Sequence, residues 1–207
     1  SSWSMRPWVL MQQAGIPFDE VMVRFDSFDA GSTFKQRLHG VNPVGKVPVL
    51  LDDGFAVWVT LAIAEYLAER FPGVWPAEAK ARARARSLCA EMHSGFHNLR
   101  SALPMNIKSR HETFKIFSGA KPDIERIKAI WAECLAAYGG PYLFGKQPCV
   151  ADAMYAPVVT RFLTYDVALD KVCSAEILNL TPDSMPQFMI ETYEKMAMGN
   201  ALLAINP

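Results

Sequence analysis

The sequence of 207 residues has few cysteines, no excess of charge of either sign and no long hydrophobic run. Its 21 basic residues balance its 21 acidic residues, so the composition favours neither a nucleic-acid surface nor a polybasic membrane anchor. The apolar runs fall short of the about 20 residues that span a bilayer, and the N-terminal residues do not resemble a signal peptide. We therefore expect a cytoplasmic protein that binds neither nucleic acid nor a membrane.

The scarce cysteines and histidines predict neither a disulfide framework nor a metal centre. The four cysteines lie far apart at positions 89, 134, 149 and 173, a spacing that favours a reducing compartment. His93 and His97 are four residues apart, as zinc ligands on one helix face are, but no third ligand is evident near them. No metal is therefore predicted.

The residues that are abundant predict a packed core, and residues 1–72 predict a small α/β domain. Hydrophobic residues make up 51% of the chain and charged residues 20%, a balance that excludes general disorder. The sequence Asp52-Asp53-Gly54 predicts a hairpin turn between two strands. We expect helices over 8–14 and 33–38 and from Thr60 onward, and strands over 20–24, within 42–51 and over 55–59.

Residues 79–207 instead predict an all-helical domain. Their apolar residues follow helical spacing over 80–103, 123–138, 150–167 and 186–198. The helix over 150–167 is apolar on most sides and is expected at the centre of the bundle. Asp152 stands at its start, where a carboxylate can accept backbone N–H groups as a helix cap. The boundary between the two domains is expected at 71–78.

Three sequence motifs in this order resemble the cytosolic glutathione transferase family over nearly the whole chain. They are Asn-Pro-Val-Gly-Lys-Val-Pro-Val-Leu over 42–50, Thr-Leu-Ala-Ile-Ala-Glu-Tyr-Leu over 60–67 and Val-Ala-Asp-Ala over 150–153. The start, Ser-Ser-Trp-Ser with Arg6 after it, is similar to the Ser-Ser-Cys-Ser start of zeta-class, serine-type members, including bacterial ones. The resemblance implies a thioredoxin-like, glutathione-binding α/β domain over 1–72, followed by an all-α substrate and dimerisation domain over 79–207.

The resemblance also implies a site for glutathione as co-substrate. Ser2 is expected to donate a hydrogen bond to the glutathione thiolate, with Ser1 as the close rival, at a helix N-terminus that favours negative charge. Val47, before a cis Pro48, would pair its backbone with the cysteinyl unit of the tripeptide. Thr60 and the free N–H groups behind it would bind the γ-glutamyl carboxylate. The resemblance further implies that the second substrate is a small electrophile and that the protein is a homodimer.

Several of these residues have a second interpretation that the sequence leaves open. The serines at the start of the chain can simply cap a helix. Lys46 can face the glycyl carboxylate of glutathione or be a solvated turn lysine. His97 and Arg100, on one face of the helix expected over 80–103, can contact the second substrate or form a half-exposed polar surface.

Four departures from the family pattern weaken a simple assignment of activity. Val59 stands where an acid or amide usually holds the γ-glutamyl ammonium, and Cys149 replaces the Ser or Thr of a capping box. Trp3 occupies the place of the zeta-class cysteine. Ser1 falls inside the first strand-to-helix turn, so the first strand of the family is expected to be missing. The alternative function is a catalytically weak binding or regulatory protein with the same fold.

Overall fold

The computed structural model describes residues 1–169 and the backbone of residues 200–205, which form two compact units. Unit 1 contains Ser1–Val74 together with the C-terminal strand, and unit 2 begins at Trp75. The division between them falls inside the range 71–78, where the sequence changes from mixed to helical. The helix expected over 186–198 lies outside the described residues.

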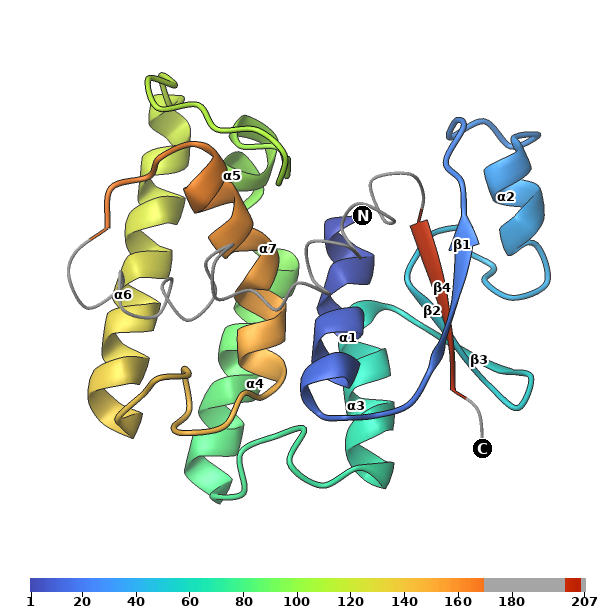
Figure 1. The fold of residues 1–207 in the computed structure, drawn as a ribbon, viewed down its shortest axis with the longest axis horizontal. Coiled ribbons are helices and arrows are strands. Elements are labelled where there is room, and N and C mark those ends of the chain that lie inside the picture. Colours follow the sequence, from blue (N-terminus) through green and yellow to red (C-terminus); the bar gives the residue numbers. More distant parts are fainter. Residues whose placement is uncertain (170–199, 206–207) are drawn as a thin grey trace. The chain divides into compact units, whose positions relative to one another are not determined.

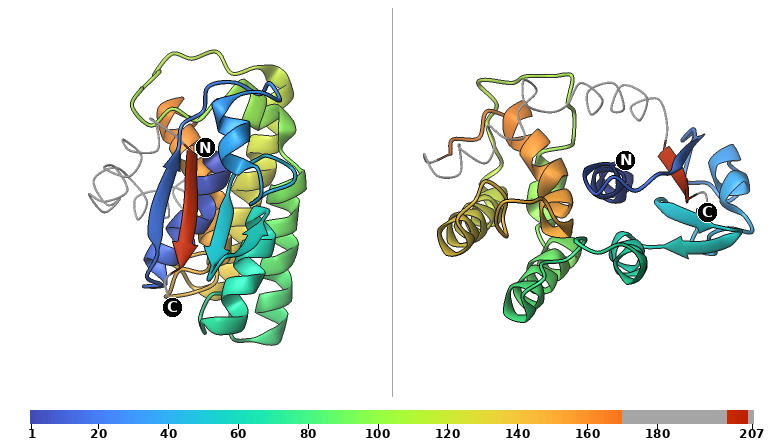
Figure 2. Two further views of the ribbon diagram at one scale, coloured as in Figure 1. Left: turned by 90° about the vertical axis from the view of Figure 1, so that its right-hand side faces the viewer. Right: turned by 60° about the horizontal axis from the view of Figure 1, so that its bottom comes forward.

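Unit 1 is a four-stranded sheet with helices on both faces (Figures 1 and 2). The strand order is β1-β4-β2-β3, in which β4 runs parallel to β2 and antiparallel to β1. Helices α1 and α3 cover one face of the sheet and α2 covers the other (Figure 2). The elements are α1 (Ser2–Gln13), β1 (Asp19–Val23), α2 (Thr33–Leu38), β2 (Val49–Asp52), β3 (Phe55–Trp58), α3 (Thr60–Arg70) and β4 (Asn200–Ile205).

The C-terminal strand corrects the expectation that residues 79–207 are all helical, and it lies in the sheet where the missing first strand was expected. The central position expected to lack a strand is filled by β4, which pairs with β1 from Asp19↔Ala204 to Val23↔Asn200 and with β2 from Val49↔Leu202 to Asp52↔Ile205. Residues 200–205 therefore belong to the sheet and not to the helical domain. The physical reason is that β1 and β2 each present unpaired backbone groups between them, and an apolar strand satisfies both rows at once.

Local sequence rules account for the rest of unit 1. The hairpin between β2 and β3 turns at Asp53 and Gly54, both with positive φ, as a two-residue turn requires. The predicted cis peptide bond between Val47 and Pro48 is confirmed. Helix α2 has the predicted bounds and packs Phe34 and Leu38 into the core on its side of the sheet.

Helix α1 begins earlier than the sequence predicts, at Ser2 and not near Trp8. The Ser1 side chain is its N-cap and accepts a hydrogen bond from the Trp3 N–H at 3.3 Å. Pro7 lies inside the helix without ending it, because the cost of its missing N–H is one lost bond to the carbonyl four residues earlier. That carbonyl belongs to Trp3, at the end of the helix where the candidate site lies.

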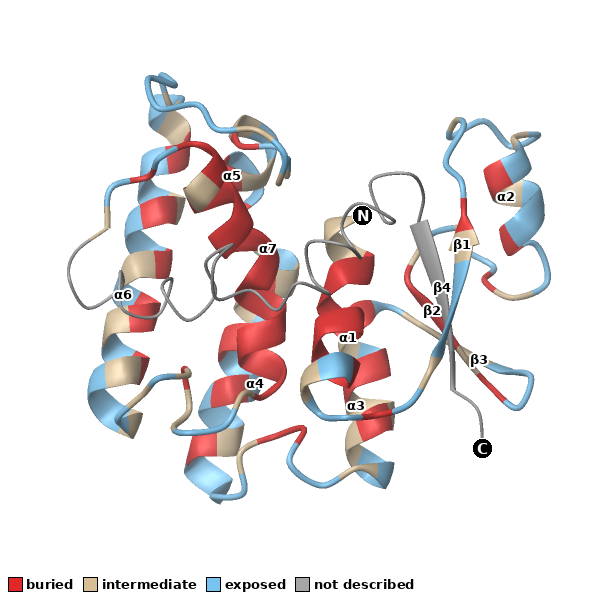
Figure 3. Ribbon diagram, viewed as in Figure 1, coloured by how far each residue is buried: buried red, intermediate tan, exposed pale blue. Residues whose placement is uncertain are grey.

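In its described part, residues 75–169, unit 2 has only helices as its regular elements. These are α4 (Ala79–Ser94), α5 (His97–Ala102), the short 3₁₀ turn η1 (Ser118–Ala120), α6 (Lys121–Tyr138) and α7 (Val150–Thr164). Helix α7 is buried along its length (Figure 3), as predicted for the centre of the bundle. The predicted cap is confirmed: Asp152 accepts the Cys149 N–H at 2.7 Å and the Leu143 N–H at 2.9 Å.

The single long helix predicted over 80–103 is wrong, because the chain breaks at Gly95 and Phe96. A Cβ on Gly95 would lie 2.8 Å from the Glu91 carbonyl oxygen, and Phe96 adopts a left-handed conformation with φ 55°. The break divides the run into α4 and α5 and buries Phe96 in the core. Hydrophobic burial thus overrides the helical pattern at this point. In the described part of the chain, no helix combines the length and the apolar character that a bilayer crossing requires.

Candidate active site at the N-termini of two helices

The N-termini of α1 and α3 meet in unit 1, and Pro7 makes the contact possible. Because Pro7 has no N–H, the Trp3 carbonyl keeps an open acceptor inside the helix. The Thr60 hydroxyl, 3% exposed, donates to this carbonyl at 3.3 Å. Thr60 is the first residue of α3, and Val59 before it offers no side-chain cap. The first N–H groups of α3 are therefore left for another acceptor.

Two serine hydroxyls lie at the N-terminus of α1 where a ligand can reach them. Ser1 accepts the Trp3 N–H, but its hydroxyl proton remains available for a donor bond. Ser2 is half-buried in the first helical turn, whereas Ser4 is fully buried. Burial also lowers the pKa of the Ser1 α-amino group. The capping role of Ser1 and a thiolate-binding role at the same helix end are compatible.

The loop before β2 presents an unpaired peptide group at the cis proline. Asn42 is buried and fixes the turn, donating from its amide to the Lys46 carbonyl at 2.6 Å and accepting the Val44 N–H at 2.9 Å. Val47 precedes the ladder that begins at Val49, and within the described residues neither its N–H nor its C=O is hydrogen-bonded. Such a group can receive one more extended strand, as the backbone of a short peptide would provide.

Lys46 and Lys35 lie at the same turn and differ in what they contact. The Lys46 side chain is exposed to solvent. The Lys35 ammonium donates to the Gly45 carbonyl at 2.7 Å and so braces the turn from α2. Lys46 is therefore the lysine of this turn that a carboxylate in solution can approach.

Val59 has a backbone conformation that a β-branched residue rarely adopts. Its φ is 72° and its ψ 122°, in a region that costs of order 1–3 kcal/mol for a residue other than glycine. Its side chain is 43% exposed, so packing does not repay this cost. The strained turn aims the N-terminus of α3 at the site, while the apolar side chain adds nothing that binds an ammonium group.

Arg6 is a cation that the sequence analysis did not assign to the site. It is only 1% exposed, its guanidinium lies 4.2 Å from the centre of the Trp3 ring, and it donates to the Ser2 carbonyl at 3.3 Å. A positive charge is thus held at the first turn of α1. The signal in the sequence was the one charged residue of this helix, three and four residues after Trp3 and Ser2.

His97 and Arg100 do not share a helix face with His93, which corrects that expectation. His93 lies at the end of α4, whereas His97 is the exposed first residue of α5. Arg100 is partly buried; burial lowers its pKa, and the nearby Asp123 opposes this shift. Both residues belong to unit 2, whereas Ser2, Val47 and Thr60 belong to unit 1. The described residues contain no group of three side chains arranged to hold a metal ion.

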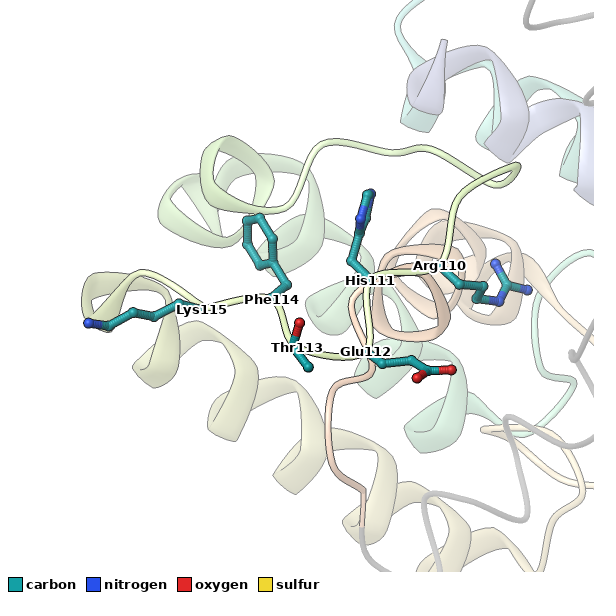
Figure 4. Close-up of a pocket in the computed structure, with 6 residues that line it drawn as sticks. All are labelled: Arg110, His111, Glu112, Thr113, Phe114 and Lys115. Carbon is teal, nitrogen blue, oxygen red and sulfur yellow. The ribbon is translucent and has the colours of Figure 1, made fainter.

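A shallow pocket of about 540 Å³ lies on unit 2, in the loop after α5 (Figure 4). Arg110, His111 and Lys115 line it, but their side chains fan out and do not converge (Figure 4). His111 stacks on Tyr165 with 5.5 Å between ring centres, a packing contact. Nor does Cys149 in this unit offer a nucleophile, since burial raises the pKa of its thiol.

Comparison with known proteins finds relatives over unit 1 and over most of the chain. Residues 1–70 match the family described as "Glutathione S-transferase, N-terminal domain". A probable maleylacetoacetate isomerase of Caenorhabditis elegans is 25% identical over 191 residues, covering 91% of this chain and 87% of the relative. The maleylacetoacetate isomerase of Pseudomonas aeruginosa is 26% identical over 175 residues, covering 82% of this chain and 81% of the relative.

Solved structures show the same fold. A glutathione transferase homologue from Burkholderia with bound glutathione matches with a TM-score of 0.64 and 22% identity, over 94% of this chain and 93% of that one. A bacterial maleyl pyruvate isomerase, described as a zeta-class glutathione S-transferase, matches with a TM-score of 0.59 and 24% identity, over 90% of this chain and 95% of that one. Residues 1–70 therefore match a glutathione S-transferase N-terminal domain, and the chain as a whole is similar in sequence to maleylacetoacetate isomerases and has the fold of glutathione S-transferases.

Proposed function

We propose that the protein is a glutathione S-transferase whose glutathione site lies between the loop at Val47 and the N-termini of α1 and α3. The observation that carries the proposal is the unpaired peptide group of Val47 beside the cis Pro48. Together with the uncapped start of α3, it offers one partner for a peptide backbone and one for a carboxylate. The tripeptide has both groups.

The chemistry follows from the end of α1. Ser2, or Ser1 in its place, donates a hydrogen bond to the sulfur of glutathione, and the helix N-terminus favours the negative charge. The thiol proton passes to solvent, and the thiolate forms a bond to an electrophilic carbon while the leaving group departs with its electron pair. His97 and Arg100 are proposed to contact this second substrate. The protein is proposed to act as a cytoplasmic homodimer.

Val59 favours one second candidate, a catalytically weak protein that binds glutathione without using it. An apolar side chain at the start of α3 cannot pair with the γ-glutamyl ammonium. Losing one charged hydrogen bond of about 1.5–3 kcal/mol weakens binding by one to two orders of magnitude. Retention on glutathione resin without turnover of a chloronitrobenzene would select this candidate, whereas turnover would exclude it.

The serine role is tested by the pH dependence of turnover in Ser2→Ala and Ser1→Ala. Loss of one hydrogen bond to a charged sulfur should raise the thiol pKa by about one to two units. The acidic limb of the turnover profile then moves to higher pH by the same amount, while glutathione affinity changes little because Val47 and Thr60 hold the tripeptide. If the limb stays in place in both variants, the serines do not activate the thiol.

A further inference from the structure

The buried Arg6 and the half-buried Trp3 form a pair that the proposed serine chemistry does not use. The guanidinium lies 4.2 Å from the centre of the Trp3 ring and the Arg6 side chain is 1% exposed. A cation over an indole ring gains electrostatic stabilisation from the ring face, more so where water is excluded. A helical side chain points back toward the N-terminus of its helix, so both groups lie at the turn that carries Ser1 and Ser2.

The hydrogen bond from Arg6 shows where the charge lies. Its guanidinium donates to the Ser2 carbonyl at 3.3 Å, within the residue proposed to contact sulfur. In the same turn, the Trp3 carbonyl accepts from the Thr60 hydroxyl. The ring of Trp3 therefore stands over the cation while its backbone is tied to α3, and both contacts restrict where the guanidinium can move.

We propose that Arg6 is a fixed cation of the glutathione site, held by Trp3 against the first turn of α1, and that it stabilises the thiolate sulfur. Trp3 is then a positioning residue for this charge. The inference rests on the proposed function and deepens it, because it assigns part of thiol activation to a side chain other than the serines. Trp3, a departure from the zeta-class pattern, thereby gains a role.

The other charged groups around α1 do not place a positive charge at its first turn. Helix α3 packs against α1 and carries Glu65, Glu69 and Arg70, of which Arg70 pairs with Asp52. The sequence of β4 contains no ionisable residue, and on β1 the Glu20 carboxylate accepts the ring N–H of Trp8, farther along α1, at 2.6 Å. On α1 itself the other titratable group is the Ser1 α-amino group. Among the described residues, Arg6 is therefore the arginine whose guanidinium lies at the N-terminus of α1. An arginine stays protonated across the accessible pH range.

The experiment compares Arg6→Met with Arg6→Lys through the ultraviolet absorbance of the bound thiolate, measured as a difference spectrum while the pH is titrated. An opposite charge within about 4–6 Å lowers a pKa by one to three units. Arg6→Met should therefore raise the pKa of bound glutathione by about one unit, a tenfold smaller thiolate fraction at neutral pH. Arg6→Lys keeps the charge and should recover most of the shift. Trp3→Leu should raise the pKa by a smaller amount.

A matched ligand separates this field from a general loss of structure. S-methylglutathione has no ionisable thiol, so its affinity should be equal in the wild type and Arg6→Met. If Arg6→Met does not fold, Arg6→Lys and Trp3→Leu decide: a thiol pKa that stays unchanged in Trp3→Leu overturns the proposal. Failure of the wild type to bind glutathione would overturn the proposed function, and this inference with it. Normal binding with an unchanged thiol pKa in Arg6→Met would overturn this inference alone.

Discussion

The N-termini of α7 and α3 differ in whether a side chain of the protein caps them. Each helix begins with N–H groups that lack a partner inside the helix. At α7, Asp152 is 3% exposed and accepts the N–H groups of Cys149 and Leu143. At α3 no side chain caps the helix, and Val59 is 43% exposed. A helix end closed by its own carboxylate serves the fold, whereas an open one is available to a ligand.

Removing the Asp152 carboxylate should lower the free energy of unfolding more than any other substitution proposed below. Asp152→Ala leaves the buried N–H groups of Leu143 and Cys149 without an acceptor. Each such group costs about 1–3 kcal/mol, so the free energy of unfolding should fall by about 3 kcal/mol. Urea denaturation followed by circular dichroism measures the change.

The matched control for Asp152→Ala is Asp123→Ala. Asp123 also accepts one backbone N–H, that of Leu99 at 2.9 Å, but it is only partly buried. Its loss should therefore lower the free energy of unfolding by about 1 kcal/mol. Equal losses in the two variants would show that burial of the carboxylate at α7 does not matter.

Adding a carboxylate at the uncapped N-terminus of α3 should increase the affinity for glutathione. Val59→Glu places an acid at the start of α3, where the γ-glutamyl ammonium is expected. One charged hydrogen bond of about 1.5–3 kcal/mol should tighten glutathione binding about tenfold or more. Isothermal titration calorimetry measures the dissociation constant, and an unchanged or weaker affinity contradicts the proposed orientation of the tripeptide.

Val59→Gly separates backbone strain from ligand binding at the same position. Glycine adopts a φ of 72° without steric cost, so the strain of Val59 is relieved while no acid is added. Part of the gain is offset by the greater freedom of glycine in the unfolded chain. We expect the free energy of unfolding to rise by about 1 kcal/mol, measured by urea denaturation, with glutathione affinity unchanged.

Helix α2 offers the smallest test, since an exposed carboxylate stabilises its start. The N–H of Phe34 and those of Ser27 and Thr33 lower the pKa of Asp26 to about 2. A lowered pKa means that the stabilisation is present above the unfolded value near 3.8 and is lost as the pH falls through about 2. In Asp26→Asn, the melting temperature should therefore depend less on pH between those two values than it does in the wild type. An unchanged slope would show that Asp26 is not coupled to folding.

Rules that act over a few residues predicted much of the fold and part of the candidate site. The turn at Asp53-Gly54, the cis bond before Pro48, the bounds of α2 and the cap by Asp152 each depend on neighbours in the chain. The predicted start of α1 is too late, because the apolar pattern begins at Trp8 whereas the N-cap is Ser1. The break at Gly95 was missed because the helical pattern continues through it while Phe96 turns into the core.

The sequence by itself determined the local elements, the motifs at Val47 and Thr60, and the absence of an acid at position 59. Only the tertiary structure decided three further features. Strand β4 fills the centre of the sheet, the Thr60 hydroxyl meets the Trp3 carbonyl freed by Pro7, and Arg6 is buried over the Trp3 ring. The physical reason is that buried backbone N–H and C=O groups and buried charges must be paired, and their partners can be far away in the sequence.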